Sequence, residues 1–159
     1  MKTEKPTTKI IAGKYKGKIL ELPSLDVTRS SKARLKESLF NVLQFDIIDK
    51  IFIESFAGSG SIGLEAISRG AKRAYFVELD RNSYQILLKN CKAVDMEKCQ
   101  TVQGNTFVQT PLFIDFLKNS QDEIVLYIDP PFDYRDGMED IYDKSFTMIK
   151  NIEVDNIYM

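Results

Sequence analysis

The sequence predicts an α/β protein with a mostly parallel sheet, helices on both faces, and a basic β-hairpin before it. Short apolar runs at residues 51–53, 74–77, 101–102 and 124–128 alternate with segments of helical periodicity. These runs are continuously apolar, as in strands buried on both faces, and they therefore indicate βαβ units. The hairpin is predicted by a separate glycine- and lysine-rich segment near the N-terminus.

The hairpin is expected over residues 9–20, where Ile and Leu pairs flank a basic turn bounded by glycines. We expect Lys14, Lys16 and Lys18 near its tip, with Tyr15 between them. Lysines held together in this way can contact phosphates, and a tyrosine ring can stack on a base. The hairpin is therefore a candidate nucleic-acid contact.

Four helices are predicted after the hairpin. In the first, residues 33–43, the spacing of Leu35, Leu39, Val42 and Leu43 predicts one buried face. The others are expected over residues 63–70, over residues 81–94 and around residues 112–118.

Charge is distributed unevenly along the chain. Residues 1–36 hold ten basic and three acidic residues, a balance of +7, whereas the remainder holds 12 basic and 20 acidic residues, a balance of −8. A basic segment on an acidic body predicts a polyanionic partner at one end only. A solvated, solubilising tail is the alternative explanation of the same charge.

Composition excludes several classes of site. The 159 residues suit one domain and include no histidine, which excludes Ser-His-Asp, Cys-His and HExxH chemistry. Cys91 and Cys99 are too few for a disulfide framework and lack zinc-ligand spacing. No apolar run approaches the ~20 residues of a membrane helix, and no signal region follows the N-terminus. We expect a cytoplasmic monomer with no membrane or metal partner.

A glycine loop follows the first strand. Gly58, Gly60 and Gly63 form G-x-G-x-x-G between strand and helix, and Glu78 ends the next strand 20 residues after Gly58. Such an acid can hold two ribose hydroxyls, so the pattern predicts an adenosine-type cofactor.

Two cofactors compete for this loop. A dinucleotide would place a pyrophosphate at the helix N-terminus, whereas S-adenosylmethionine carries a sulfonium and an ammonium group. Glu54, at the end of the first strand, would repel a pyrophosphate and attract an ammonium group. This favours the methyl donor over a nicotinamide dinucleotide.

The fourth strand leads into Asp129-Pro130-Pro131-Phe132. A rigid strand-ending turn would explain the two prolines alone. The acid before the two prolines and the aromatic ring after them indicate a functional site in addition to a turn. The amine of a nucleobase is a poor nucleophile, and two acceptors that hold its N–H bonds aim its lone pair at a methyl group. The Asp129 carboxylate and the Pro130 carbonyl can be these acceptors, and Phe132 can stack on an extruded base.

These motifs stand in the order of a known family, and the chain resembles bacterial 16S ribosomal RNA guanine-N2 methyltransferases of the RsmD type. The resemblance covers roughly residues 9–135. It rests on Ile10 to Lys18, on Thr28-Arg29, on Arg34 to Asn41, on Phe56 to Ala71, on Phe76-Val77-Glu78 and on the Asp-Pro-Pro-Phe motif.

The resemblance implies a Rossmann-like, class I S-adenosylmethionine-dependent methyltransferase fold over residues 27–159 after a hairpin extension over residues 1–26. It implies S-adenosylmethionine as methyl donor and, as substrate, the N2 amine of a guanine in 16S ribosomal RNA, within the small subunit or its assembly intermediate. The expected cofactor-binding residues are Glu54, Phe56, Ala57, Gly58, Ser59, Gly60, Gly63, Glu78, Leu79, Asn105, Thr106 and Asp129. The expected RNA contacts are Lys14, Tyr15, Lys16, Lys18, Arg29, Lys32, Arg34, Tyr134 and Arg135. Tyr134 and Arg135 lie either in a loop that closes over the base or in a surface turn.

The chain departs from the family in three places. Residues 28–31 read Thr-Arg-Ser-Ser where the family has Thr-Arg-Pro-Thr, and Asn105 replaces an acid near the adenine amine. Relatives continue through a further strand and a closing hairpin, so we expect the C-terminal strands to be truncated or replaced.

Two alternative functions remain open. The Asp-Pro-Pro-Phe motif also serves DNA amino-methyltransferases that act on adenine N6 or cytosine N4, although a chain of this size leaves little room for a sequence-reading module. The other alternative is a catalytically impaired RNA-binding or ribosome-assembly factor, a hypothesis motivated by Asn105 and the short C-terminus.

Overall fold

The computed structural model describes residues 5–23, 29–131, 140–152 and 157–158. Its main sheet has the order β5-β4-β3-β6-β7, and every neighbouring pair is parallel. The strands are β3 (Ile51–Glu54), β4 (Arg73–Glu78), β5 (Cys99–Gln103), β6 (Ile124–Tyr127) and β7 (Ile157–Tyr158). From β3 the chain runs outward through β4 to β5 and then returns to place β6 on the other side of β3. This reversal is the topological switch point at which open α/β sheets bind ligands.

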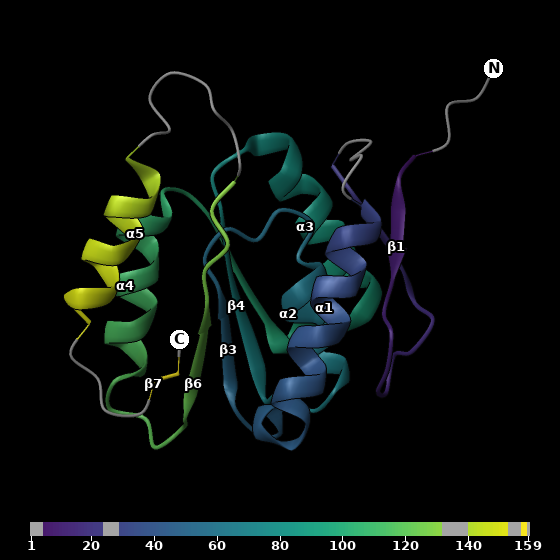
Figure 1. The fold of residues 1–159 in the computed structure, drawn as a ribbon, viewed down its shortest axis with the longest axis horizontal. Coiled ribbons are helices and arrows are strands. Elements are labelled where there is room, and N and C mark those ends of the chain that lie inside the picture. The colour runs from purple at the N-terminus through teal and green to yellow at the C-terminus, as the bar shows by residue number, and fades with distance from the viewer. Residues whose placement is uncertain (1–4, 24–28, 132–139, 153–156, 159) are drawn as a thin grey trace.

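Helices cover both faces of the sheet (Figure 1). On one face lie α1 (Arg29–Leu43), α2 (Ser61–Ser68) and α3 (Arg81–Val94), and on the other α4 (Thr106–Leu117) and α5 (Ile141–Lys150). Short 3-10 turns, η1 (Gln44–Ile47) and η2 (Met96–Lys98), follow α1 and α3. No helix in the described ranges is long and apolar enough to cross a bilayer.

Alternate residues of the central strands face two separate cores. Phe52 and Phe76 pack against the side of α1, α2 and α3, whereas Ile53 and Tyr75 pack against α4. Burial on both faces explains why these strands read as continuous apolar runs. Cys91 and Cys99 are free thiols, and both are buried.

The predicted hairpin is present and is docked on the outside of the helical layer (Figure 1). Its strands, β1 (Thr7–Lys9) and β2 (Ile19–Glu21), are antiparallel, with Lys9 opposite Ile19. The loop between them lies against the end of α2, where the Lys14 N–H donates to the Ser68 carbonyl at 2.8 Å. Ile10 and Leu20 are buried in the main core. The hairpin is therefore part of the folded body.

A buried carboxylate fastens this hairpin to α2. Glu65 is fully buried and accepts the backbone N–H groups of Ile11 at 2.9 Å and Ala12 at 3.1 Å. It also pairs with Arg69 at 2.8 Å and with the buried Lys36 at 3.5 Å. Four donors offset much of the cost of burying the charge.

The predicted apolar face of the first helix is buried only in part. Leu35 is 52% exposed and Val42 is 80% exposed, whereas Lys36 and Phe40 are buried. Leu39 and Leu43 pack at the edge of the core, as expected. Lys36 can turn inward because its ammonium group meets Glu65 and donates to the Lys9 carbonyl at 3.0 Å. A pattern based on hydrophobicity cannot foresee an internal partner for a lysine.

Two helices on the opposite face differ from expectation. The helix expected around residues 112–118 begins at Thr106, because the Asn105 side chain accepts the Phe107 N–H and caps the helix there. Helix α5 was not expected from the sequence.

Gly13→Ala should destabilise the protein more than Gly17→Ala. Both glycines have positive φ, +92° and +87°, so each alanine carries a backbone cost of about 1–2 kcal/mol. A Cβ at Gly13 would also lie 2.0 Å from the Ser68 carbonyl oxygen, whereas one at Gly17 meets nothing within 4 Å. We expect an additional loss of about 2 kcal/mol or more for Gly13→Ala, measured by urea denaturation. Equal losses would contradict the docking of the hairpin on α2.

Candidate functional site

Three acids gather at the carboxyl ends of the central strands. Glu54 ends β3, Glu78 ends β4, and Asp129 follows β6 by two residues. In the register of the sheet, Glu54 is opposite Phe76 of β4 and Tyr127 of β6. The Glu78 and Asp129 carboxylates both act electrostatically on Glu54. The structure thus brings the glycine loop and the Asp-Pro-Pro turn to one edge of the sheet, at the switch point.

The glycine loop is held by hydrogen bonds to the end of β4. The Ala57 N–H donates to the Val77 carbonyl at 2.9 Å, and the Gly58 N–H donates to Glu78 Oε1 at 2.7 Å. Gly58 has φ +54°, and a Cβ there would point into open space. The loop therefore presents an open surface beside the Glu78 carboxylate.

The other two glycines of the motif serve packing. A Cβ on Gly60 would lie 2.5 Å from Leu87 Cδ1, and one on Gly63 would lie 2.3 Å from the Phe76 ring. Gly60 also has φ +81° and sits at the N-cap of α2. These glycines allow the loop and α2 to approach β4 and α3 closely.

Glu54 is the most deeply buried acid of the site, with 2% of its surface exposed. Its Oε1 accepts the Gly63 N–H at 3.2 Å. Burial raises the pKa of this carboxyl well above its usual range, and Asp129 and Glu78 raise it further, whereas the Gly63 N–H and Lys36 oppose the shift. Such a carboxyl gains most from a cationic group placed beside it.

The remaining predicted cofactor residues lie around this edge in different settings. Leu79 is 68% exposed, and the Phe56 ring is half-buried with its edge to Phe107. Asn105 is exposed, and its Oδ1 is already used in capping α4. Thr106 is buried, and its hydroxyl contacts that of Thr110 at 2.8 Å.

The Asp-Pro-Pro turn begins with an exposed acid. Asp129 and Pro131 are exposed, whereas Pro130 is buried. Tyr127, which the sequence analysis did not select, belongs to the same group: burial and the Asp129 and Glu54 carboxylates raise its pKa. The phenol therefore stays neutral beside these acids. Of the remaining predicted residues, Phe132, Tyr134 and Arg135 lie outside the described residues.

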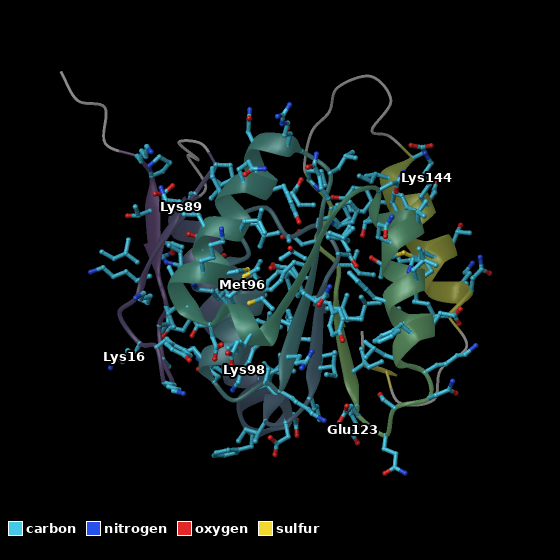
Figure 2. All side chains as sticks on the ribbon, turned by 180° about the vertical axis from the view of Figure 1, so that it is seen from behind. Lys16, Lys89, Met96, Lys98, Glu123 and Lys144 are labelled. Atoms are coloured by element: carbon cyan, nitrogen blue, oxygen red, sulfur yellow. The ribbon has the colours of Figure 1, made fainter. Side chains whose placement is uncertain are left out.

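The predicted RNA contacts divide between surface and interior. Lys14, Lys16 and Lys18 are exposed, and Figure 2 shows Lys16 at the outer edge of the hairpin. Tyr15 is half-buried, packs against the main core, and donates its hydroxyl to Asp95 at 3.0 Å. The tyrosine thus helps dock the hairpin, and its stacking role stays a prediction.

The basic residues of α1 complete the predicted RNA contacts. Arg34 is exposed. Arg29 and Lys32 lie in the first turn of α1, and their side chains are outside the description.

Two buried polar residues near the glycine loop, Glu65 and Asn90, were not selected from the sequence. Both stand at core-facing positions of helices, where a polar residue needs an internal partner, and that placement is the signal that could have found them. A cavity of about 600 Å³ between α4 and α5 was also not foreseen. Its lining includes Phe107, whose ring also meets Phe56.

Comparison with known proteins identifies the family of this chain. The profile of a family described as "Conserved hypothetical protein 95" matches residues 8–153. The chain belongs to this family. Curated relatives named "Ribosomal RNA small subunit methyltransferase D" confirm the resemblance of the chain to RsmD-type proteins that the sequence predicted. The Haemophilus influenzae protein is 38% identical over 133 residues, and the Escherichia coli K12 protein 34% over 125 residues.

These relatives are longer than the chain. The matches cover 82% and 78% of this chain but 66% and 60% of the two relatives. A solved structure of a putative methyltransferase from Escherichia coli has a TM-score of 0.69 at 29% identity, covering 97% of this chain and 75% of that one. A putative methylase from Haemophilus influenzae has a TM-score of 0.62 at 30% identity, covering 97% and 76%. These structures confirm the predicted Rossmann-like methyltransferase fold.

Glu54→Gln should change how stability depends on pH. A raised pKa means that the folded state binds this proton more tightly than the unfolded chain, whose value is about 4.5. The wild-type free energy of unfolding therefore falls as pH rises from about 4.5 through the raised pKa. The variant keeps an oxygen for the Gly63 N–H and cannot ionise, so its stability relative to wild type should increase with pH.

Urea denaturation between about pH 5 and pH 9 measures this difference. Glu37→Gln, at an exposed position of α1, provides the background. A wild-type-minus-variant difference that does not change with pH would show that the Glu54 proton is not bound more tightly in the folded state.

Proposed function

We propose that the chain is an S-adenosylmethionine-dependent methyltransferase that modifies the N2 amine of a guanine in 16S ribosomal RNA of the small subunit. The observation that carries this proposal is the meeting of the glycine loop with the Asp129-Pro130 corner at one edge of the sheet, through the adjacent strands β3 and β6. The names of the relatives, which are ribosomal RNA methyltransferases of the small subunit, support the substrate class.

The residues at this edge fit S-adenosylmethionine. Gly58 leaves open space beside the loop, and the Glu78 carboxylate next to it can accept hydroxyl donors. The buried Glu54 carboxyl, which an adjacent cation helps to ionise, can pair with an ammonium group and is a poor environment for a pyrophosphate. This donor set favours the methyl donor over a dinucleotide. When bound, the cofactor supplies an activated methyl group on a sulfonium.

In this proposal Asp129 and Pro130 orient the target amine. The exposed Asp129 carboxylate and the Pro130 carbonyl are acceptors on a corner that two prolines stiffen. They hold the two N–H bonds of the amine and direct its lone pair toward the methyl group. Orientation supplies much of the acceleration, because a donor with a cationic leaving group makes strong general-base catalysis unnecessary. Phe132 is proposed to stack on the base, and Pro131 to fix the corner.

The hairpin is proposed as the RNA contact of an N-terminal extension, residues 1–26. Its exposed lysines project from a loop that Glu65 and Ser68 hold against α2. Cations held in a fixed arrangement neutralise phosphates without further ordering of the loop. A DNA amino-methyltransferase is the second candidate, because the Asp-Pro-Pro-Phe motif also serves adenine and cytosine amines.

Asp129→Asn should reduce methyl transfer about 10- to 100-fold, because the neutral amide keeps one acceptor oxygen but binds the N–H of the target amine more weakly than the carboxylate does. Tritium transfer from labelled S-adenosylmethionine to small ribosomal subunits measures the loss. The subunits come from cells that lack an enzyme of this family, and duplex DNA is offered in parallel. Glu123→Gln is the matched control, because Glu123 precedes the opposite end of the same strand (Figure 2).

A fully active Asp129→Asn would refute the orienting role. Transfer to DNA instead of subunits would refute the substrate and support the second candidate.

Replacing Lys16 and Lys18 together with alanine should raise the KM for subunits and leave cofactor affinity unchanged. Each lost phosphate contact should also reduce the slope of log affinity against log salt by about 0.7–0.9. Steady-state kinetics across a salt series measure both effects. Lys118→Ala is the control. Lys118 is an exposed lysine at the end of α4, where it pairs with Asp115 on the face of the sheet opposite the hairpin. An unchanged salt slope in the double variant would contradict contact between the hairpin and RNA.

A further inference from the structure

Asn90 makes direct hydrogen bonds to both the hairpin and the glycine loop. It lies in α3 and is 2% exposed. Its Oδ1 accepts the Glu21 N–H at 2.9 Å, and its Nδ2 donates to the Glu21 carbonyl at 2.9 Å. The same Nδ2 donates to the Ser59 carbonyl at 2.9 Å. Glu21 ends β2, and Ser59 lies between Gly58 and Gly60, so one side chain spans two elements that are far apart in sequence.

The carboxamide is the chemical group that this position requires. It offers one acceptor oxygen and two N–H donors. Oxygen and one N–H pair with the two backbone groups of Glu21, as a residue of a neighbouring strand would, and the second N–H holds Ser59. An aspartate of the same size has no donor for either carbonyl when it is ionised.

Other contacts run parallel to this connection without reaching Ser59. On the far side of the hairpin, Glu65 binds the N–H groups of Ile11 and Ala12 to α2, the helix that starts directly after the glycine loop. Lys89, next to Asn90 in α3, pairs with the Glu21 carboxylate at 2.7 Å and is 62% exposed. Lys89 thus joins the same helix to the same hairpin residue.

We propose that Asn90 is a positioning residue that couples the cofactor loop to the hairpin, so that cofactor and RNA bind cooperatively. Local opening of either element breaks bonds to the same side chain. A ligand that keeps the loop closed therefore lowers the cost of ordering β2, and the effect is reciprocal. This coupling rests on the proposed function for the identity of its two ligands.

Hydrogen exchange with and without S-adenosylhomocysteine tests the connection in the absence of RNA. In wild type and in Lys89→Ala, this ligand should slow exchange at residues 19–22. In Asn90→Asp and Asn90→Ala the slowing at residues 19–22 should be lost, while saturating ligand still protects the glycine loop. The dissociation constant of S-adenosylhomocysteine should rise about threefold to tenfold in the Asn90 variants. It should stay within about twofold of wild type in Lys89→Ala.

A purely structural role of Asn90 gives a different result. It would lower the thermal stability of the Asn90 variants but leave ligand affinity and ligand-induced protection as in wild type, and that result overturns the proposal. If neither variant folds, the wild-type exchange experiment decides: absence of ligand-induced protection at residues 19–22 also overturns it.

A second measurement extends the test to RNA. A saturating concentration of small ribosomal subunits should lower the dissociation constant of S-adenosylhomocysteine in wild type and Lys89→Ala. The same concentration should leave this constant unchanged in Asn90→Asp. Equal tightening in Asn90→Asp overturns the coupling. Subunits that do not bind would refute the proposed substrate, and the exchange experiment with S-adenosylhomocysteine alone would still decide the role of Asn90.

Discussion

The Glu65 carboxylate gathers donors from three parts of the chain at one buried point. It accepts backbone N–H groups from the hairpin loop, pairs with Arg69 one turn along its own helix, and meets the inward-turned Lys36 of α1. A buried charge with these partners is stable, whereas removal of any one donor leaves part of the cost of desolvating the carboxylate uncompensated. The position of α1, the docking of the hairpin and the setting of α2 all depend on this point. The Arg69 guanidinium also lies over the Phe40 ring, which ties the charged cluster to the core.

The site contains a carboxyl, Glu54, whose charged form is unfavourable in the free protein. Glu54 is buried without a cation as its main partner, and its raised pKa records the unfavourable energy of the charged form. Asp129 and Glu78 at the same edge add to this energy. A cationic ligand beside Glu54 would favour the charged form, so binding of such a ligand is coupled to loss of the Glu54 proton. Functional sites commonly carry such perturbed groups.

The hairpin and the cofactor edge belong to one connected body. Asn90 joins β2 to the glycine loop, and Tyr15 joins the basic loop to Asp95 at the end of α3. The extension that is proposed to contact RNA is thereby fixed relative to the loop and to the carboxyl ends of the strands. That arrangement suits a reaction in which a large substrate must place one small amine accurately.

The sequence by itself determined the order of elements from the hairpin to β6, the glycine loop, and the acids at the strand ends. These features depend on local periodicity, on turn residues and on the position of a residue within its own element. The interior polar contacts were decided only by the tertiary structure. Three examples depend on partners 27 to 69 residues away. They are the burial of Lys36 where Leu35 was expected, the contacts of Glu65 with the hairpin, and the contacts of Asn90 with β2. A buried charge or amide is stable only when such a distant group meets it, and no local pattern records that meeting.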